Sequence, residues 1–230
     1  AAKQTQDTPL PVVEQPSDAA GADQTDPQPD LRVDNPIDFP ALKLENQDIY
    51  AWIYIPGTKV NHPVVQHIND DYYYLTHNRY NQASPEGAIY SQMANNTDFS
   101  DPVTILYGHN NINEAMFSTL HYFGNEEFFA ANDTFYIYTP GRILTYRIFS
   151  AYLYDDRHIL NSFDFKKPNV VLDYFAFVAQ PDSLLVNARP DTKLTVSDKI
   201  VQLSTCMSDP LQANSRFLVN GVLIDDQPTY

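Results

Sequence analysis

The sequence predicts an all-β domain with few helices, preceded by a segment that has no core of its own. Tyrosine and phenylalanine are abundant, with 16 and 13 copies, and many lie in the alternating runs that suit half-buried strands. From residue 37 onward, short apolar runs alternate with polar loops, and one pair of runs flanks a Pro140-Gly141 turn. A domain of about eight short strands and few helices is typical of a closed barrel or a sandwich.

The individual elements follow from apolar periodicity and from turn residues. The predicted strands are residues 50–55, 60–66, 87–90, 103–107, 134–139, 143–154, 199–205 and 217–224, and the predicted helices are 36–44, 114–123 and 169–179. In the arm 143–154, strict alternation assigns two faces: Tyr146, Ile148, Tyr152 and Tyr154 on one, and Phe149, Ala151 and Leu153 on the other.

Residues 1–36 differ in composition from the rest of the chain. They hold six prolines and seven acidic residues, but only Lys3 and Arg32 as bases. This composition predicts a disordered, acidic, Pro-rich linker, either a stalk or a dispensable tail, before a folded domain at 37–230. No apolar run reaches the roughly 18–20 residues of a membrane span, and no signal peptide is visible, so any membrane anchor is expected upstream of this chain.

The net charge of -15 argues against nucleic acid as a partner. Phosphate neutralisation needs clustered lysine and arginine side chains, which this chain lacks.

Three residues at predicted strand ends carry reactive side chains. Cys206, the only cysteine, ends the run 201–206; His109 follows the strand 103–107 and Gly108; and Arg216 opens the last strand. If the strands of Cys206 and Arg216 are neighbours, the intervening loop returns the guanidinium beside the thiol.

Together these residues suit acyl transfer. A thiolate attacks an acyl carbon, an imidazole transfers the proton of the leaving amine, and a guanidinium stabilises the oxyanion. Each also has a structural alternative: Cys206 as a buried hydrophobe or an intermolecular link, His109 as a loop histidine bonded to backbone, and Arg216 as a solvated charge. Their joint presence favours catalysis.

Longer motifs surround these residues: Leu203-Ser204-Thr205-Cys206 with Arg216 ten positions on, and Tyr107-Gly108-His109-Asn110 followed by Met116-Phe117 and Leu120. They resemble the sortases, cysteine transpeptidases of Gram-positive surfaces. Similarity to class B is closer, on Ile55-Pro56-Gly57-Thr58, Pro63-Val64-Val65-Gln66, Tyr73-Tyr74-Leu75 and a long insertion between Tyr154 and Val196. Gln202 departs from the threonine that is common in the family.

The resemblance implies a closed eight-stranded β-barrel with an N-terminal helix and a helix-containing insertion before the cysteine strand. It implies Cys206 as the nucleophile, His109 as the general acid/base and Arg216 as the oxyanion and substrate stabiliser. The residues that would line the groove are Tyr107, Ser204, Thr205 and Leu75, with the insertion helix as part of its wall. Tyr174, Phe175 and Phe177 of that helix are equally consistent with plain core.

The resemblance also implies a reaction and its partners. The family cleaves a C-terminal sorting signal after threonine, holds the protein as a thioester, and transfers it to an amine of a lipid-linked peptidoglycan precursor or to a pilin lysine. The expected location is the extracellular face of the cytoplasmic membrane of a Gram-positive bacterium. Class B relatives are associated with Asn-Pro-x-Thr signals, but the first position stays open here. A hydrolytic cysteine peptidase and a non-enzymatic adhesion module remain as alternatives.

No cofactor and no metal are expected. The chemistry needs neither, and no Asp-x-Asp loop with calcium-binding spacing occurs. Asp209 is a candidate to orient His109.

Overall fold

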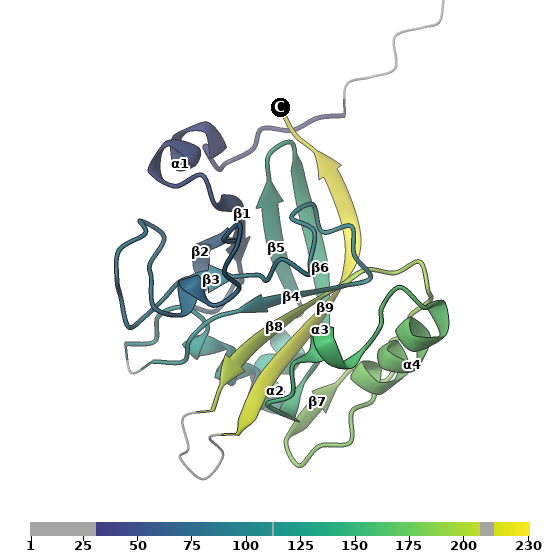
Figure 1. The fold of residues 1–230 in the computed structure, drawn as a ribbon. Helices are drawn as coiled ribbons and strands as arrows, with labels where there is room; N and C mark the ends of the chain where they lie inside the picture. Colours follow the sequence, from purple (N-terminus) through teal and green to yellow (C-terminus); the bar gives the residue numbers. More distant parts are fainter. Residues whose placement is uncertain (1–30, 112, 208–213) are drawn as a thin grey trace, which may run out of the picture. The chain divides into compact units, whose positions relative to one another are not determined.

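The strands of the computed structural model close into a barrel, with one strand added outside it (Figure 1). In chain order they are β1 (Ile49–Tyr54), β2 (Asn61–Val65), β3 (Ile89–Tyr90), β4 (Val103–Tyr107), β5 (Thr134–Thr139), β6 (Arg142–Asp155), β7 (Val186–Ala188), β8 (Ile200–Cys206) and β9 (Ser215–Pro228). Pairing runs β5-β1-β2-β3-β4-β8-β9-β6-β7, and β5 also pairs with β6. That last pairing closes eight strands and leaves β7 on the edge of β6, so the predicted eight-stranded barrel is confirmed.

The structure describes residues 31–111, 113–207 and 214–230, and residues 32–230 form one compact unit. Residues 1–30 of the predicted linker therefore lie outside the described residues. Near its end, the amide of Val33 donates to Pro228 (3.1 Å) and the side-chain amide of Asn35 donates to Thr139 (2.9 Å). Residues 33–35 thus lie against the ends of β9 and β5, and the division at residue 36 stays a prediction.

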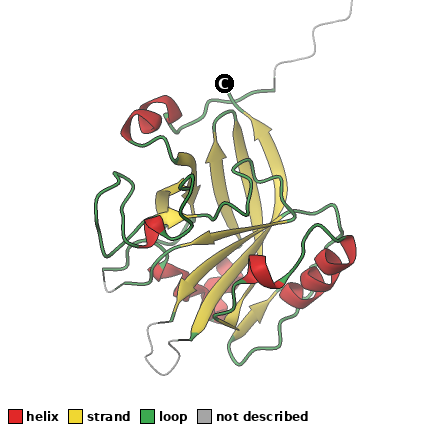
Figure 2. Cartoon of the chain, viewed as in Figure 1, coloured by secondary structure: helices red, strands yellow, loops and turns green. Residues whose placement is uncertain are grey.

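The helices lie around the barrel (Figure 2). They are α1 (Phe39–Glu45), η1 (Tyr73–Leu75), η2 (Ser118–Gly124), α2 (Glu126–Ala131), α3 (Ile159–Ser162) and α4 (Pro168–Ala179), of which η1 and η2 are 3₁₀ turns. At the start of α1, the Asp38 side chain accepts from the Ala41 amide, and Pro40 occupies the first turn. The predicted helices at 36–44 and 169–179 are confirmed with shifted ends.

The helix predicted at 114–123 is wrong over its first half. Glu114 and Met116 have φ angles of 54° and 49°, in the left-handed region that no right-handed helix admits. Only the 3₁₀ turn η2 forms, from Ser118 onward.

The faces predicted for β6 are also wrong beyond Ile148. A register shift between Ile148 and Ser150 adds a residue to β6 relative to β9. Tyr146, Ile148 and Ala151 consequently pack inside the barrel, whereas Phe149 and Tyr152 pack in a second cluster beneath α4. Leu153 joins the barrel cluster and Tyr154 the second one.

The insertion helix α4 is joined to the strands by a buried chain of hydrogen bonds. The Tyr174 hydroxyl donates to Gln202 Oε1 (2.9 Å), and Gln202 Nε2 donates to Asn220 Oδ1 (2.7 Å). Asn220 Nδ2 then donates to Ser150 Oγ (3.1 Å), which donates to the Val178 carbonyl (2.6 Å). This chain links α4, β8, β9 and β6, and it gives Gln202, fully buried, a structural role.

We expect Gln202→Ala to destabilise the fold, because it leaves the buried Tyr174 hydroxyl without its acceptor and Asn220 Oδ1 without its donor. Each unsatisfied group costs about 1–3 kcal/mol. Urea unfolding measures the free energy of unfolding, with Gln82→Ala, at an exposed position, as the control. Equal stability of the two variants would contradict the role of the network.

Candidate active site

Two parallel strands bring His109 and Cys206 to the same edge of the barrel. β4 pairs with β8 in parallel, with Tyr107 opposite Ser204, and the Gly108 amide donates to the Ser204 carbonyl (3.2 Å). Both strands therefore end at the same level. His109 follows Gly108, while Cys206 is the last residue of β8.

An antiparallel pairing brings Arg216 to the same place. β8 pairs with β9, and Cys206 lies directly opposite Arg216 in the register. The prediction that the cysteine and arginine strands are neighbours is confirmed. Arg216 also donates from Nη1 to the carbonyl of Ser215 (3.1 Å).

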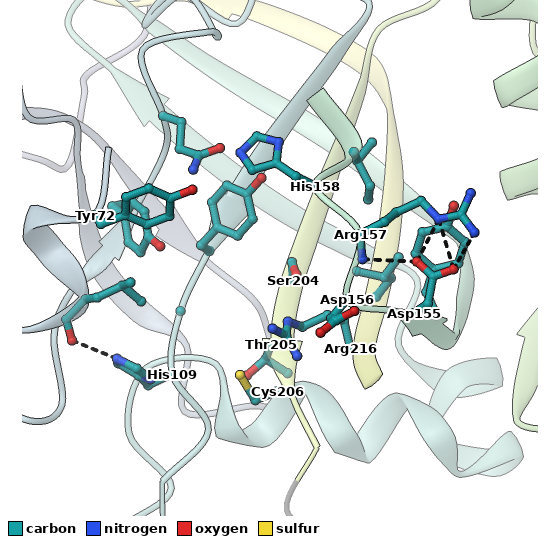
Figure 3. Close-up of a pocket in the computed structure, with 18 residues that line it drawn as sticks. Tyr72, His109, Asp155, Asp156, Arg157, His158, Ser204, Thr205, Cys206 and Arg216 are labelled. Atoms are coloured by element: carbon teal, nitrogen blue, oxygen red, sulfur yellow. Dashed lines mark hydrogen bonds and ion pairs between the residues drawn. The ribbon is translucent and has the colours of Figure 1, made fainter. Parts of the chain in front are cut away.

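A pocket of about 320 Å³ opens at this edge (Figure 3). His109, Cys206 and Arg216 all line it, from three different strand ends. The four residues predicted to line the groove are also in its lining: Tyr107, Ser204, Thr205 and Leu75. Figure 3 shows the Cys206 thiol between His109 and Arg216.

Hydrogen bonds to backbone carbonyls hold the His109 ring and the main chain of Cys206. His109 Nε2 lies 2.8 Å from the Leu75 carbonyl oxygen. The carbonyl of Cys206 faces Asn110 Nδ2 at 3.1 Å and His121 Nε2 at 3.1 Å, and these two nitrogens are 3.0 Å apart. Asn110 thereby extends the contact between the ends of β4 and β8 by one more bond.

His121 and the Asn110 contact were missed from sequence. Asn110 belongs to the quoted motif, but nothing in the sequence indicates that its amide reaches Cys206. Burial lowers the pKa of His121, opposed in part by the hydrogen bond to Cys206. His121 is therefore neutral at neutral pH. Its ring packs against the Phe217 ring.

The remaining wall comes from the start of the insertion rather than from its helix. Residues 154–159, from the end of β6 to the first residue of α3, line the pocket, and no residue of α4 does. The expectation that the insertion helix forms a wall is therefore corrected. The physical reason is that Tyr174 and Phe175 of α4 are buried in the second core cluster, between α4 and the outer face of the barrel.

Further pocket residues were not identified from sequence. Tyr72, Tyr90, Gln92 and His158 also line the pocket, and Figure 3 shows Tyr72 and His158 on the side away from Cys206. Burial raises the pKa of Tyr90 and of Tyr107, so both hydroxyls keep their protons. Gln92 Oε1 and Thr205 Oγ1 are buried without a hydrogen-bond partner among the described residues.

Asp209, the candidate to orient His109, lies outside the described residues. Within the ranges that are described, no three His, Cys, Asp or Glu side chains are placed to hold a metal ion. In the same ranges, none of the helices has the length and apolar character needed to cross a membrane.

Comparison with known proteins gives a consistent result. A family model described as the sortase domain matches residues 53–224. Sortase B of Listeria monocytogenes is 28% identical over 183 residues, covering 80% of this chain and 72% of that protein. Sortase B of Staphylococcus aureus is 28% identical over 187 residues, covering 81% and 74%.

Solved structures agree. An X-ray structure of Clostridium perfringens sortase B superposes with a TM-score of 0.72 at 32% identity, covering 81% of this chain and 99% of that one. A Bacillus anthracis protein described as similar to sortase B gives a TM-score of 0.70 at 31% identity, covering 81% of this chain and 82% of that one. A family model matches more than half of the chain, and the barrel and the relatives agree with it. The chain therefore belongs to the sortase family of cysteine transpeptidases, and the relatives that it resembles are sortases B.

Proposed function

We propose that this sortase cleaves a C-terminal sorting signal after its threonine, holds the acyl part as a thioester on Cys206, and transfers it to an amine. One observation carries the assignment of roles: the register places Cys206 opposite Arg216, and His109 lines the same pocket from the neighbouring parallel strand. No other cysteine exists in the chain to serve as the nucleophile.

The first half of the reaction forms the thioester. The Cys206 thiolate attacks the threonine carbonyl carbon, and negative charge develops on the carbonyl oxygen, where the Arg216 guanidinium stabilises it. The carbon–nitrogen bond then breaks. The leaving amine takes a proton from the protonated His109, which becomes neutral.

The second half resolves the thioester. An incoming amine attacks the same carbonyl carbon, His109 accepts the proton that this nitrogen loses, and the carbon–sulfur bond breaks to release the Cys206 thiolate. A thiol is a better leaving group than an alcohol when an amine attacks, which suits sulfur to a transfer reaction.

The substrates follow from the family. Sortases are cell-envelope enzymes of Gram-positive bacteria, and we propose surface proteins with C-terminal sorting signals as donors. The acceptor is a lipid-linked peptidoglycan precursor or a pilin lysine. An anchor upstream of residues 1–36 would place the barrel at the extracellular face of the membrane.

Product partition distinguishes transfer from hydrolysis. Labelled pentapeptides with proline second and threonine fourth, varied at the first and third positions, are incubated with and without a short peptide that has a free amino terminus. We expect an amide product that increases with the amine concentration, and Cys206→Ala to reduce it by orders of magnitude. Mass spectrometry of the products checks this.

Two outcomes of that assay would contradict the proposal. Only the carboxylic acid at every amine concentration would favour a hydrolytic peptidase. Full activity of Cys206→Ala would remove the proposed nucleophile.

Arg216→Lys tests the proposed role of the guanidinium. Lysine keeps the charge but lacks the planar, multi-donor head group, so we expect kcat to fall about 100-fold. Arg147→Lys is the control, because Arg147 forms an exposed ion pair with Asp191 away from the pocket. Steady-state kinetics on the best peptide measures both, and equal kcat values would argue against a transition-state role for Arg216.

A further inference from the structure

The hydrogen bond between His109 and Leu75 determines which ring nitrogen carries the proton. A carbonyl oxygen only accepts, so the neutral His109 ring donates from Nε2 to Leu75 across 2.8 Å. Nδ1 is then the nitrogen with the lone pair. In Figure 3 this bond leaves the ring on the side opposite the Cys206 thiol.

Gly87 packs against the same contact. It has a φ angle of +60°, and a Cβ atom there would lie 2.5 Å from the Tyr74 carbonyl oxygen, 3.0 Å from the Leu75 carbonyl oxygen and 3.1 Å from His109 Cδ2. Cδ2 is bonded to Nε2, so Gly87 lies beside the edge of the ring that donates to Leu75. Only a residue without a side chain fits there with the contact intact.

The turn η1, which carries Leu75, is itself anchored on both sides. The Ala88 amide, next to Gly87, donates to the Tyr74 carbonyl (3.0 Å). The Tyr74 side chain is buried, and its hydroxyl donates to Asp48 (2.8 Å) and accepts from Asn46 Nδ2 (2.8 Å). Asn46 is the C-cap residue of α1. The N-terminal helix and the segment around Gly87 therefore hold the Leu75 carbonyl in place together.

We propose that this arrangement of Gly87, Tyr74 and the Leu75 carbonyl is a positioning device that keeps His109 protonated on Nε2 and so assigns proton transfer to Nδ1. The proposal rests on the proposed acid/base role of His109. During thioester formation, Nδ1 gives its proton to the leaving amine. Nε2 keeps its own proton, which it donates in the hydrogen bond to the Leu75 carbonyl. During transfer to the acceptor, Nδ1 takes a proton from the incoming amine, and the ring returns to its starting state.

Nitrogen NMR of ¹⁵N-histidine-labelled enzyme tests the proposal without relying on turnover. The chain has six histidines, and the His109 signals are identified by their loss in His109→Gln. In wild type with a neutral His109 ring, we expect the Nε2–H tautomer. In Gly87→Ala, we expect a mixture of tautomers and a kcat lowered about 10- to 100-fold, because displacement by about 1 Å suffices for such a loss, while KM stays within about threefold.

Gly141→Ala is the matched control. Gly141 also has a positive φ, +87°, but a Cβ atom there meets nothing within 4 Å. The backbone strain is therefore comparable and the contact with His109 is absent. We expect the wild-type tautomer and a kcat within about twofold of wild type.

Three results would overturn the proposal. The first is an Nδ1–H tautomer of His109 in wild type, and the second is a folded Gly87→Ala enzyme with wild-type tautomer and kcat. If Gly87→Ala does not fold, Tyr74→Phe decides in its place, and an unchanged tautomer and kcat there count against it equally. The third is full transfer activity of His109→Gln, which would remove the proposed acid/base role of His109. In that case, an Nε2–H tautomer in wild type would show that the hydrogen bond to Leu75 exists without that role.

Discussion

The register between β4, β8 and β9 is the constraint on which the site depends. β8 is the central strand: its parallel pairing with β4 puts His109 at the level of Cys206, and its antiparallel pairing with β9 puts Arg216 opposite Cys206. Because side chains alternate, a slip of one residue in either pairing would turn one of these side chains to the other face. The apolar side chains of β8 pack on both faces, Val201 inside the barrel and Ile200 under α4, so each face fixes this register.

Polar contacts supply what apolar packing does not specify. Gln202 joins β8 to β9 and to α4 inside the core, where burial makes a partly satisfied network costly. At the open end of the strands, Asn110 and His121 hold the Cys206 carbonyl, and Leu75 holds the His109 ring. Cys206 is thus held through its backbone carbonyl and His109 through its ring nitrogen Nε2, while the Cys206 thiol remains in the pocket lining.

The barrel, and the gathering of Cys206, His109 and Arg216 at one edge of it, could be predicted from sequence because their signals are local. Apolar runs end at Cys206 and Gly108, and the Cys206–Arg216 spacing fits a strand, loop and strand. The face change in β6 could not be predicted, because the extra residue after Ile148 exists only relative to β9. The Leu75 carbonyl escaped prediction as well, since backbone atoms carry no sequence signal and 34 positions separate Leu75 from His109.

Intact mass spectrometry of the enzyme mixed with a sorting peptide, without any amine acceptor and quenched in acid, tests the central claim most directly. If the strand register assembles one acyl-transfer site, the enzyme gains the mass of the peptide up to its threonine, and digestion places that mass on Cys206. The adduct disappears when an amine is added before the quench. An acyl group on any other residue, or peptide cleavage that proceeds in Cys206→Ser without an adduct, would contradict the account.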